Sequence, residues 1–192
     1  TVGWVENPAS ATRSSHMRTY KRLQIEGGCY FFTVNLANRQ HNDLLVREIE
    51  ALRDAFRQTR ADHPFEIDAI VVLPEHLHTI WQLPPHDSDF STRWRLIKSR
   101  FSQAIKTGEH ISESRLKKGE RGVWQRRFWE HLIRDDVDYA RHVDYIHYNP
   151  VKHGHCARAA DWQHSSFQRW VDQGIYSIDW AAADATRELS FE

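Results

Sequence analysis

Residues 65–84, FEIDAIVVLPEHLHTIWQLP, contain two apolar runs that are separated only by Pro74 and Glu75. Apolar and β-branched runs on either side of a turn-forming pair are typical of a β-hairpin. Side chains two positions apart in a strand lie on the same face of the sheet. The hairpin therefore predicts that His76 and His78, at the start of its second strand, point in the same direction.

Further elements are expected on both sides of this hairpin. A strand at residues 29–37 precedes a helix at 42–60, in which apolar residues recur every three or four positions. After the hairpin come a helix at 91–105 and a strand at 128–135. The basic residues of this helix are expected to face outward, and its inward residues are expected to be Trp94, Ile97, Phe101 and Ile105.

The last predicted helix begins near Asp135 or Asp136, either of which can cap it, and ends where Pro150 stops it. The order β-α-β-β-α-β, followed by this helix, predicts an α+β, ferredoxin-like domain. Its mostly antiparallel sheet is expected to have two helices packed on one face, with a C-terminal tyrosine-bearing helix and a tail. Residues 161–171 are ambiguous and can form one more packed helix.

The length of 192 residues predicts one domain, which we place at residues 17–155. Residues 1–16 are expected to be an N-terminal extension, and residues 156–192 a tail that packs on the domain or extends from it. No run of about 18 apolar residues is present, so no membrane span is expected. The two cysteines, Cys29 and Cys156, form no disulfide framework, which favours a reducing, cytoplasmic location.

The formal net charge of +0 hides an uneven distribution of charge. Residues 93–127 contain 11 basic and three acidic side chains, a local balance of +8. Such a segment attracts a polyanion. A solvated helix face followed by a polar loop explains the same charges equally well.

Tyr145 and Asn149 lie four residues apart in the last predicted helix and so share one of its faces. Two imidazoles and an amide oxygen can hold a divalent cation and leave coordination positions open. Each element alone is a weak signal, because 13 histidines in 192 residues produce about one such pair by chance. A tyrosine and an asparagine on an amphipathic helix more often mark a core edge and a helix terminus.

The segments LPEHLHTIW, FWEHLIRD, HVDYIHYNPVKHG and GGCYFFTVNLANR together resemble the REP-associated tyrosine transposases, a bacterial branch of the single-tyrosine HUH transposases. The resemblance covers about residues 18–170. It implies a ferredoxin-like catalytic domain that cleaves single-stranded DNA beside short palindromic hairpins. By position, it implies that His76, His78 and Asn149 hold Mg²⁺ or Mn²⁺ and that Tyr145 is the nucleophile. Many more distant relatives carry Gln where Asn149 stands. The Gln side chain is one methylene longer, so Asn149 has the shorter reach to a metal ion.

The implied reaction is metal-dependent cleavage and strand transfer through a 5′-phosphotyrosine. Because one phosphodiester is exchanged for another, a DNA 3′-hydroxyl can reverse the step. The implied partner is a single-stranded DNA hairpin, and we expect the chain to act as a monomer. The residues expected to contact DNA are Arg18, Lys21, Arg22, Arg93, Arg95, Lys98, Arg100, Lys117, Lys118, Arg121, Trp124, Arg126, Arg127 and Lys152. Trp124 and Trp129 are both candidates for stacking on a base, but a position in the core explains the same residues and is favoured for Trp129.

Two other functions are compatible with the sequence. One is a DNA- or RNA-hairpin binding protein that keeps the fold but does not cleave. The other is a Zn²⁺ hydrolase that uses His76, His78 and one of His131, His142 or His153, although no acidic ligand or Glu base stands at a metalloenzyme spacing. Glu75 is expected to face away from His76.

Overall fold

Four strands form one antiparallel sheet in the order β2-β3-β1-β4. This computed structural model describes residues 24–106, 113–117, 119 and 121–180. The strands are β1 (Cys29–Asn35), β2 (Glu66–Val72), β3 (His76–Gln82) and β4 (Trp129–Leu132). All three neighbouring pairs are antiparallel, and β2 and β3 form the expected hairpin. The strand order and the β-α-β-β-α-β sequence confirm the ferredoxin-like α+β fold.

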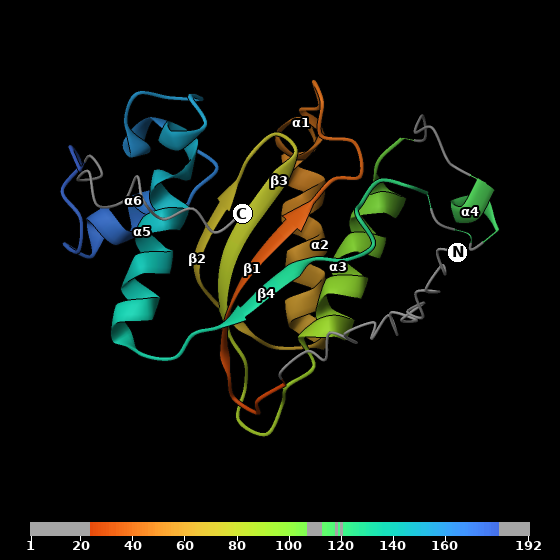
Figure 1. Cartoon of the computed structure of the whole chain (residues 1–192), viewed down its shortest axis with the longest axis horizontal. Coiled ribbons are helices and arrows are strands. Elements are labelled where there is room, and N and C mark those ends of the chain that lie inside the picture. Colours follow the sequence, from red (N-terminus) through yellow and green to blue (C-terminus); the bar gives the residue numbers. More distant parts are fainter. Residues whose placement is uncertain (1–23, 107–112, 118, 120, 181–192) are drawn as a thin grey trace, which may run out of the picture.

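Helices α2 (Ile49–Asp62) and α3 (Phe90–Ala104) cover one face of the sheet (Figure 1). Alternation along β1 sends Tyr30, Phe32 and Val34 into the core beneath these helices, whereas Phe31 points to the opposite face. The predicted inward residues of α3 are buried, among them Trp94, whose ring stacks on Trp81 of β3 at 4.3 Å. The hydrophobic pattern thus placed these two helices correctly.

The opposite face of the sheet is covered as well, by helix α5 (Asp136–Lys152) (Figure 1). The expectation that helices cover only one face is therefore wrong, because Phe31, Ile80 and Ile146 form a second apolar core between the sheet and α5. Helix α6 (Phe167–Asp172) and the short 3-10 helix η1 (Ala159–Asp161) lie beside α5. The fold therefore has three layers, which are α2 and α3, the sheet, and α5.

Two predicted boundaries of α5 have different outcomes. Asp135 caps the helix as expected, because its side chain accepts a hydrogen bond from the Asp138 backbone N–H at 2.8 Å. The prediction that Pro150 ends the helix is wrong, since α5 continues to Lys152. Proline lacks a backbone N–H donor, but so close to the helix end this single loss does not stop the helix. The chain leaves the helix just after its C-cap His153, at Gly154, which has a φ of 73°.

Other boundaries shift by a few residues. The expected helix at 42–60 is divided at Glu48 into a short α1 (Leu44–Arg47) and α2. The polar loop after α3 contains a single helical turn, α4 (Glu113–Leu116). Strand β4 is half as long as predicted. None of the helices in the described part of the chain is long and apolar enough to cross a membrane.

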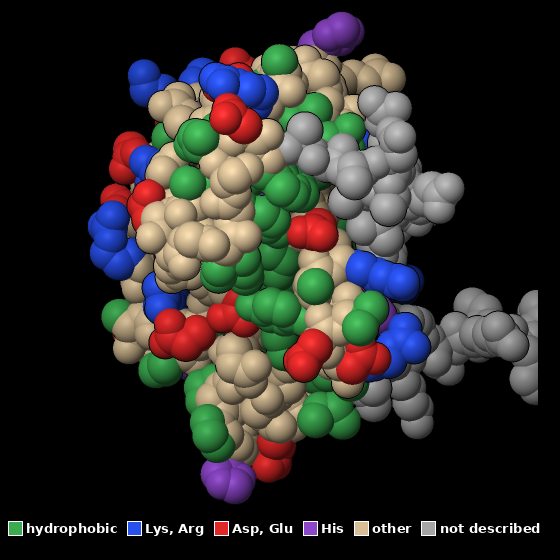
Figure 2. All heavy atoms as spheres, turned by 90° about the vertical axis from the view of Figure 1, so that its left-hand side faces the viewer, with side chains coloured by type: hydrophobic (Ala, Val, Ile, Leu, Met, Phe, Trp, Pro, Cys, Tyr) green, Lys and Arg blue, Asp and Glu red, His purple; other side chains and the backbone are tan. Residues whose placement is uncertain are grey.

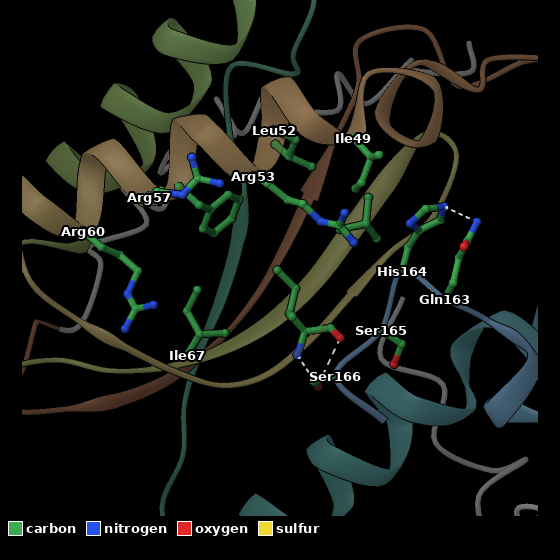
Figure 3. A pocket seen from close by; sticks show the side chains of 13 residues that line it. Ile49, Leu52, Arg53, Arg57, Arg60, Ile67, Gln163, His164, Ser165 and Ser166 are labelled. Carbon is green, nitrogen blue, oxygen red and sulfur yellow. Dashed lines mark hydrogen bonds between the residues drawn. The ribbon is translucent and has the colours of Figure 1, made fainter. Parts of the chain in front are cut away.

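Residues 163–166 run beside the outer edge of β2. Val72 donates a backbone hydrogen bond to His164, and Ser166 donates one to Ile70, each at 2.8 Å. The Ser166 hydroxyl also binds the Ile70 backbone (Figure 3). The described part of the predicted tail therefore packs on the domain and protects an edge strand. The N-terminal extension lies outside the described residues.

Candidate active site

His76 and His78 stand at the start of β3 and face α5. Their ring centroids are 4.9 Å apart, with an angle of 83° between the ring planes. Their exposed fractions are only 1% and 2%. The two imidazoles therefore converge in a buried space between the sheet and the helix, as strand alternation predicts.

Each imidazole is anchored through its Nδ1 atom. His76 Nδ1 donates to the Glu75 carboxylate at 3.0 Å, and His78 Nδ1 is hydrogen-bonded to Thr33 Oγ1 at 2.9 Å. Both Nε2 atoms are buried and have no hydrogen-bond partner among the described residues. The expectation that Glu75 faces away from His76 is wrong, because Glu75 belongs to the turn before β3 and does not follow strand alternation. Glu75 and Thr33 are thus site residues that the sequence pattern did not identify.

Helix α5 brings Tyr145 to this space. The Tyr145 ring lies 5.1 Å from the His78 ring, centroid to centroid, at an angle of 71°. Asn149 follows one turn later and is fully buried, and neither of its amide atoms has a hydrogen-bond partner in the described part of the chain. The His153 and His76 ring centroids are 5.3 Å apart, and Lys152 Nζ lies 5.0 Å from the centroid of the Tyr145 ring.

Burial keeps His78 in the neutral form that binds metals. Burial is the main cause that holds the pKa of His78 well below its usual value, and the nearby imidazoles of His76 and His153 and the Lys152 ammonium add to it. Burial alone would raise the pKa of Glu75, but the hydrogen bond from His76, reinforced by one from Arg39, outweighs it and lowers this pKa to about 2. His78 is therefore neutral at pH 7, while Glu75 is ionised and can orient His76.

These buried atoms fit a divalent cation. A buried polar atom without a partner loses the free energy of its bonds to water. Here two imidazole nitrogens and an amide meet this description, and all are neutral metal ligands. The set contains no carboxylate among its candidate ligands, so charge compensation has to come from an anionic substrate. Imidazole suits Mn²⁺ or Zn²⁺ better than Mg²⁺.

His131, Asp138 and His142 form a second group of metal-binding residue types, with ligand atoms within 4.8 Å of one another. His131 Nε2 lies 2.8 Å from the Asp138 carboxylate, and the His131 and His142 rings stack at 4.7 Å with 19° between their planes. Nearly parallel rings cannot direct their in-plane lone pairs at one cation without rotation. This group therefore stays as a stacked, hydrogen-bonded link between β4 and α5, and it does not supply a third imidazole to His76 and His78.

The basic segment has a more mixed outcome. Arg93 was expected outward but is 2% exposed, because its guanidinium pairs with Asp87 at 2.6 Å and binds backbone carbonyls. Arg100 pairs with Asp62 of α2. Trp124 is 7% exposed and belongs to the first core, whereas Trp129, expected in the core, is 41% exposed. The two tryptophans thus exchange the roles that the sequence predicted.

Several of the remaining basic residues meet in a groove between α3 and the loop that follows it. The groove has a volume of about 720 Å³. Arg121 and Arg126 hold the loop through bonds to backbone carbonyls, and Lys98 bonds the Gln125 carbonyl at 2.9 Å. Its basic lining residues are Arg95, Lys98, Arg115, Arg121 and Arg126. Lys117 and Arg127 are exposed, as is Lys152. Arg18, Lys21, Arg22 and Lys118 lie outside the described residues.

A second pocket, of about 440 Å³, opens between α2 and β2 and contains none of the predicted catalytic residues (Figure 3). Isoleucines and Leu52 line its floor, and three arginines of α2 stand at its rim. Each of these arginines pairs with a nearby carboxylate, which neutralises the rim. The pocket is therefore separate from the histidine pair in both place and chemistry.

A ferredoxin-like sheet with a His-x-His pair on one strand, faced by a tyrosine-bearing helix, is the arrangement of HUH-type transposases. Among curated proteins, the chain is 50% identical to a REP-associated tyrosine transposase of Escherichia coli K12 over 86% of this chain and 92% of the relative. It is 46% identical to a putative REP-associated tyrosine transposase of Haemophilus influenzae over 85% of this chain and 93% of the relative.

Among solved structures, the fold is similar to that of the REP-associated tyrosine transposase bound to a REP hairpin. The TM-score is 0.76 at 49% identity, over 87% of this chain and 93% of the other. No family model matches the chain. At these identities and coverages, the chain belongs to the REP-associated tyrosine transposases.

Proposed function

We propose that this transposase cleaves single-stranded DNA beside palindromic, REP-type hairpins and transfers the strand through a 5′-phosphotyrosine on Tyr145. One observation carries the proposal: Tyr145 lies beside a buried histidine pair whose Nε2 atoms, like the amide of Asn149, have no partner among the described residues. The relative whose structure is bound to a REP hairpin supports the choice of substrate.

In the proposed step, the Tyr145 oxygen attacks the scissile phosphorus. The new O–P bond forms as the bond to the 3′-oxygen breaks, the phenolic proton passes to water, and the 3′-oxygen takes up a proton. A phenol with a pKa of about 10 is a weak nucleophile at pH 7, so the site has to stabilise the charge on the phosphate. Lys152 Nζ, 5.0 Å from the ring centroid, places a positive charge beside this reaction.

His76, His78 and Asn149 would hold the Mg²⁺ or Mn²⁺ ion. When bound, the ion supplies Lewis-acid polarisation of a non-bridging phosphate oxygen. Glu75 and Thr33 hold the imidazoles so that both Nε2 atoms point into the site. Tyr145 is 2% exposed, and therefore side chains around it have to move before a phosphodiester can reach the hydroxyl.

The basic groove between α3 and its loop is the proposed grip on the hairpin stem. Five of its lining side chains are Lys or Arg, which bind phosphates without reading the bases. The face that carries α5 and α6 is less suitable, because hydrophobic side chains occupy its middle with Asp and Glu among them, and Lys and Arg lie mainly toward its edges (Figure 2).

We further propose that the chain acts as a monomer in the cytoplasm. Tyr145 and His78 are neighbours within one chain, so the active site needs no helix from a second subunit. Both cysteines are free, which is typical of a reducing compartment.

A labelled hairpin oligonucleotide with single-stranded flanks, incubated with Mg²⁺ or Mn²⁺, tests the proposal. A covalent protein–DNA band that resists denaturant is expected for the wild type, and Tyr145→Phe is expected to abolish the band while binding is retained. Binding without a band favours the hairpin-binding alternative. Cleavage without a band, sustained by Zn²⁺, favours a hydrolase.

A further inference from the structure

Trp129 is a large aromatic side chain that the fold leaves partly in solvent. Its side chain is 41% exposed, although Glu130, the next residue of β4, and Phe31 of the neighbouring strand β1 are buried. The other large apolar side chains found exposed in the described ranges are aliphatic: Ile25, Val137, Ile175 and Ile178. A single exposed apolar residue needs no explanation by itself, so its surroundings decide whether it has a role.

The Trp129 ring is held rigidly from two sides. It lies parallel to the His131 ring, at 5.9 Å with 7° between the planes, and His131 in turn stacks on His142. It also meets the edge of Phe31 at 5.7 Å. The Asp138 carboxylate fixes His131 through its Nε2 atom at 2.8 Å. An indole fixed in this way loses little conformational entropy when a ligand stacks on it.

Trp129 is also close to the proposed catalytic residues. Phe31 contacts Trp129 and, at 6.0 Å between centroids, the Tyr145 ring. The same Phe31 ring stacks on His78 at 5.5 Å. A single side chain thus separates Trp129 from both the nucleophile and the histidine pair, a span comparable to one or two nucleotides of single-stranded DNA.

The surroundings of β4 also suit a nucleic acid strand. Within the described residues, β4 pairs only with β1, and no other strand pairs with its outer edge. Two exposed cations, Arg127 and Arg134, flank the strand in the sequence. An aromatic face with cations on either side is the usual arrangement for binding unpaired bases, because every base can stack and every phosphate is anionic.

We infer that Trp129 is the stacking platform for an unpaired base of the flank next to the scissile phosphate. The inference rests on the proposed function, because it assumes that Tyr145 attacks a single strand. Stacking then holds the strand in register with the nucleophile, and the hairpin stem stays in the basic groove. Hydrogen bonds to a base edge are not required, so Trp129 is expected to fix position more than sequence.

The test uses the full chain without metal, so that no cleavage occurs, and hairpin oligonucleotides with 2-aminopurine at one flank position at a time. This base fluoresces under excitation that tryptophan does not absorb, and stacking quenches it. We expect strong quenching at one or two positions for wild type and Trp129→Phe, and its loss for Trp129→Ala. Val137→Ala, another exposed apolar truncation, is the matched control and is expected to leave quenching unchanged.

Affinity measured on the same oligonucleotides completes the test. Trp129→Ala is expected to weaken binding about 5- to 150-fold. An abasic site at the quenched position should weaken DNA binding by the wild type by the same factor. It should not weaken binding by Trp129→Ala any further. Unchanged quenching in Trp129→Ala would overturn the inference. It would also be overturned if the wild type lost affinity equally with every abasic oligonucleotide and the Trp129→Ala protein had a lower melting temperature. Failure of the wild type to form an adduct with metal would instead remove the proposed function and leave this result interpretable.

Discussion

Replacing Glu75 tests whether the carboxylate orients His76 for metal binding. The Glu75 side chain is 17% exposed, and its pKa of about 2 lies well below the usual value of 4.5. Hydrogen bonds from His76, the Glu75 backbone and Arg39 together favour the ionised form. Loss of such a carboxylate partner typically weakens metal binding about 10- to 100-fold. We expect about tenfold for Glu75→Gln, which keeps an acceptor, and up to about 100-fold for Glu75→Ala.

The assay is titration of Mn²⁺ into the Tyr145→Phe protein bound to hairpin DNA, with unbound Mn²⁺ followed by electron paramagnetic resonance. Arg39→Gln is the matched control, because Arg39 contacts the same carboxylate at 3.4 Å without touching His76. It is expected to change the affinity by less than about threefold. Equal Mn²⁺ affinity for Glu75→Ala and the parent protein would refute the role assigned to Glu75.

Four further outcomes are expected. Without DNA, calorimetry should find Mg²⁺ affinity weaker than micromolar, and tight binding would contradict a neutral ligand set. DNA affinity should fall steeply with salt, and Arg95→Ala should reduce the slope by about one. Arg93→Ala should instead lower the stability by about 1 to 3 kcal/mol, because it leaves the backbone carbonyls of Pro64 and Asp89 without this donor. Burial lowers the pKa of His147 from 6.5 to about 3, so stability should fall as the pH drops from 6.5 toward 3, by at most roughly 5 kcal/mol, and His147→Leu should flatten this dependence in pH-resolved thermal melts.

The arrangement of strands and the two helices on one face were predictable because hydrophobic period and turn residues determine them locally. The hairpin turn at Pro74 and Glu75 and the buried stripe of α3 are examples. Coverage of the second face was not predictable in the same way. The alternation of β1 shows that Phe31 faces away from Tyr30, but what packs against Phe31 depends on where α5 lies in space.

Side-chain placement beyond the backbone pattern was harder to predict. The outward position assigned to Arg93 followed the charge of the helix, yet Asp87 in the preceding loop draws the guanidinium inward. Trp124 and Trp129 carry the same side chain, but Trp124 packs against Phe101 of α3 in the first core, whereas Trp129 stands at the start of the edge strand β4. The anchoring of His76 by Glu75 depends on the conformation of a turn residue, which strand alternation does not describe.

The meeting of Tyr145 with the histidines was expected from the resemblance to a family, since helical spacing alone left a core edge equally possible. The structure places Tyr145 beside His78, while Tyr139 is hydrogen-bonded to Asp68. Burial, with the charge of that aspartate, raises the pKa of Tyr139 and makes it a poorer nucleophile. Geometry therefore separates tyrosines that the sequence places on one helix.

The central claim is that Tyr145 is the residue that becomes joined to DNA, and peptide mapping of the adduct tests it most directly. Trypsin cleaves after Arg141 and Lys152, so Tyr145 and Tyr148 fall in one peptide and Tyr139 in the one before it. Fragmentation of the nucleotide-bearing peptide then distinguishes the first two. We predict a 5′-phosphonucleotide on Tyr145. A nucleotide on Tyr148 or Tyr139, with Tyr145 unmodified, would contradict the assignment.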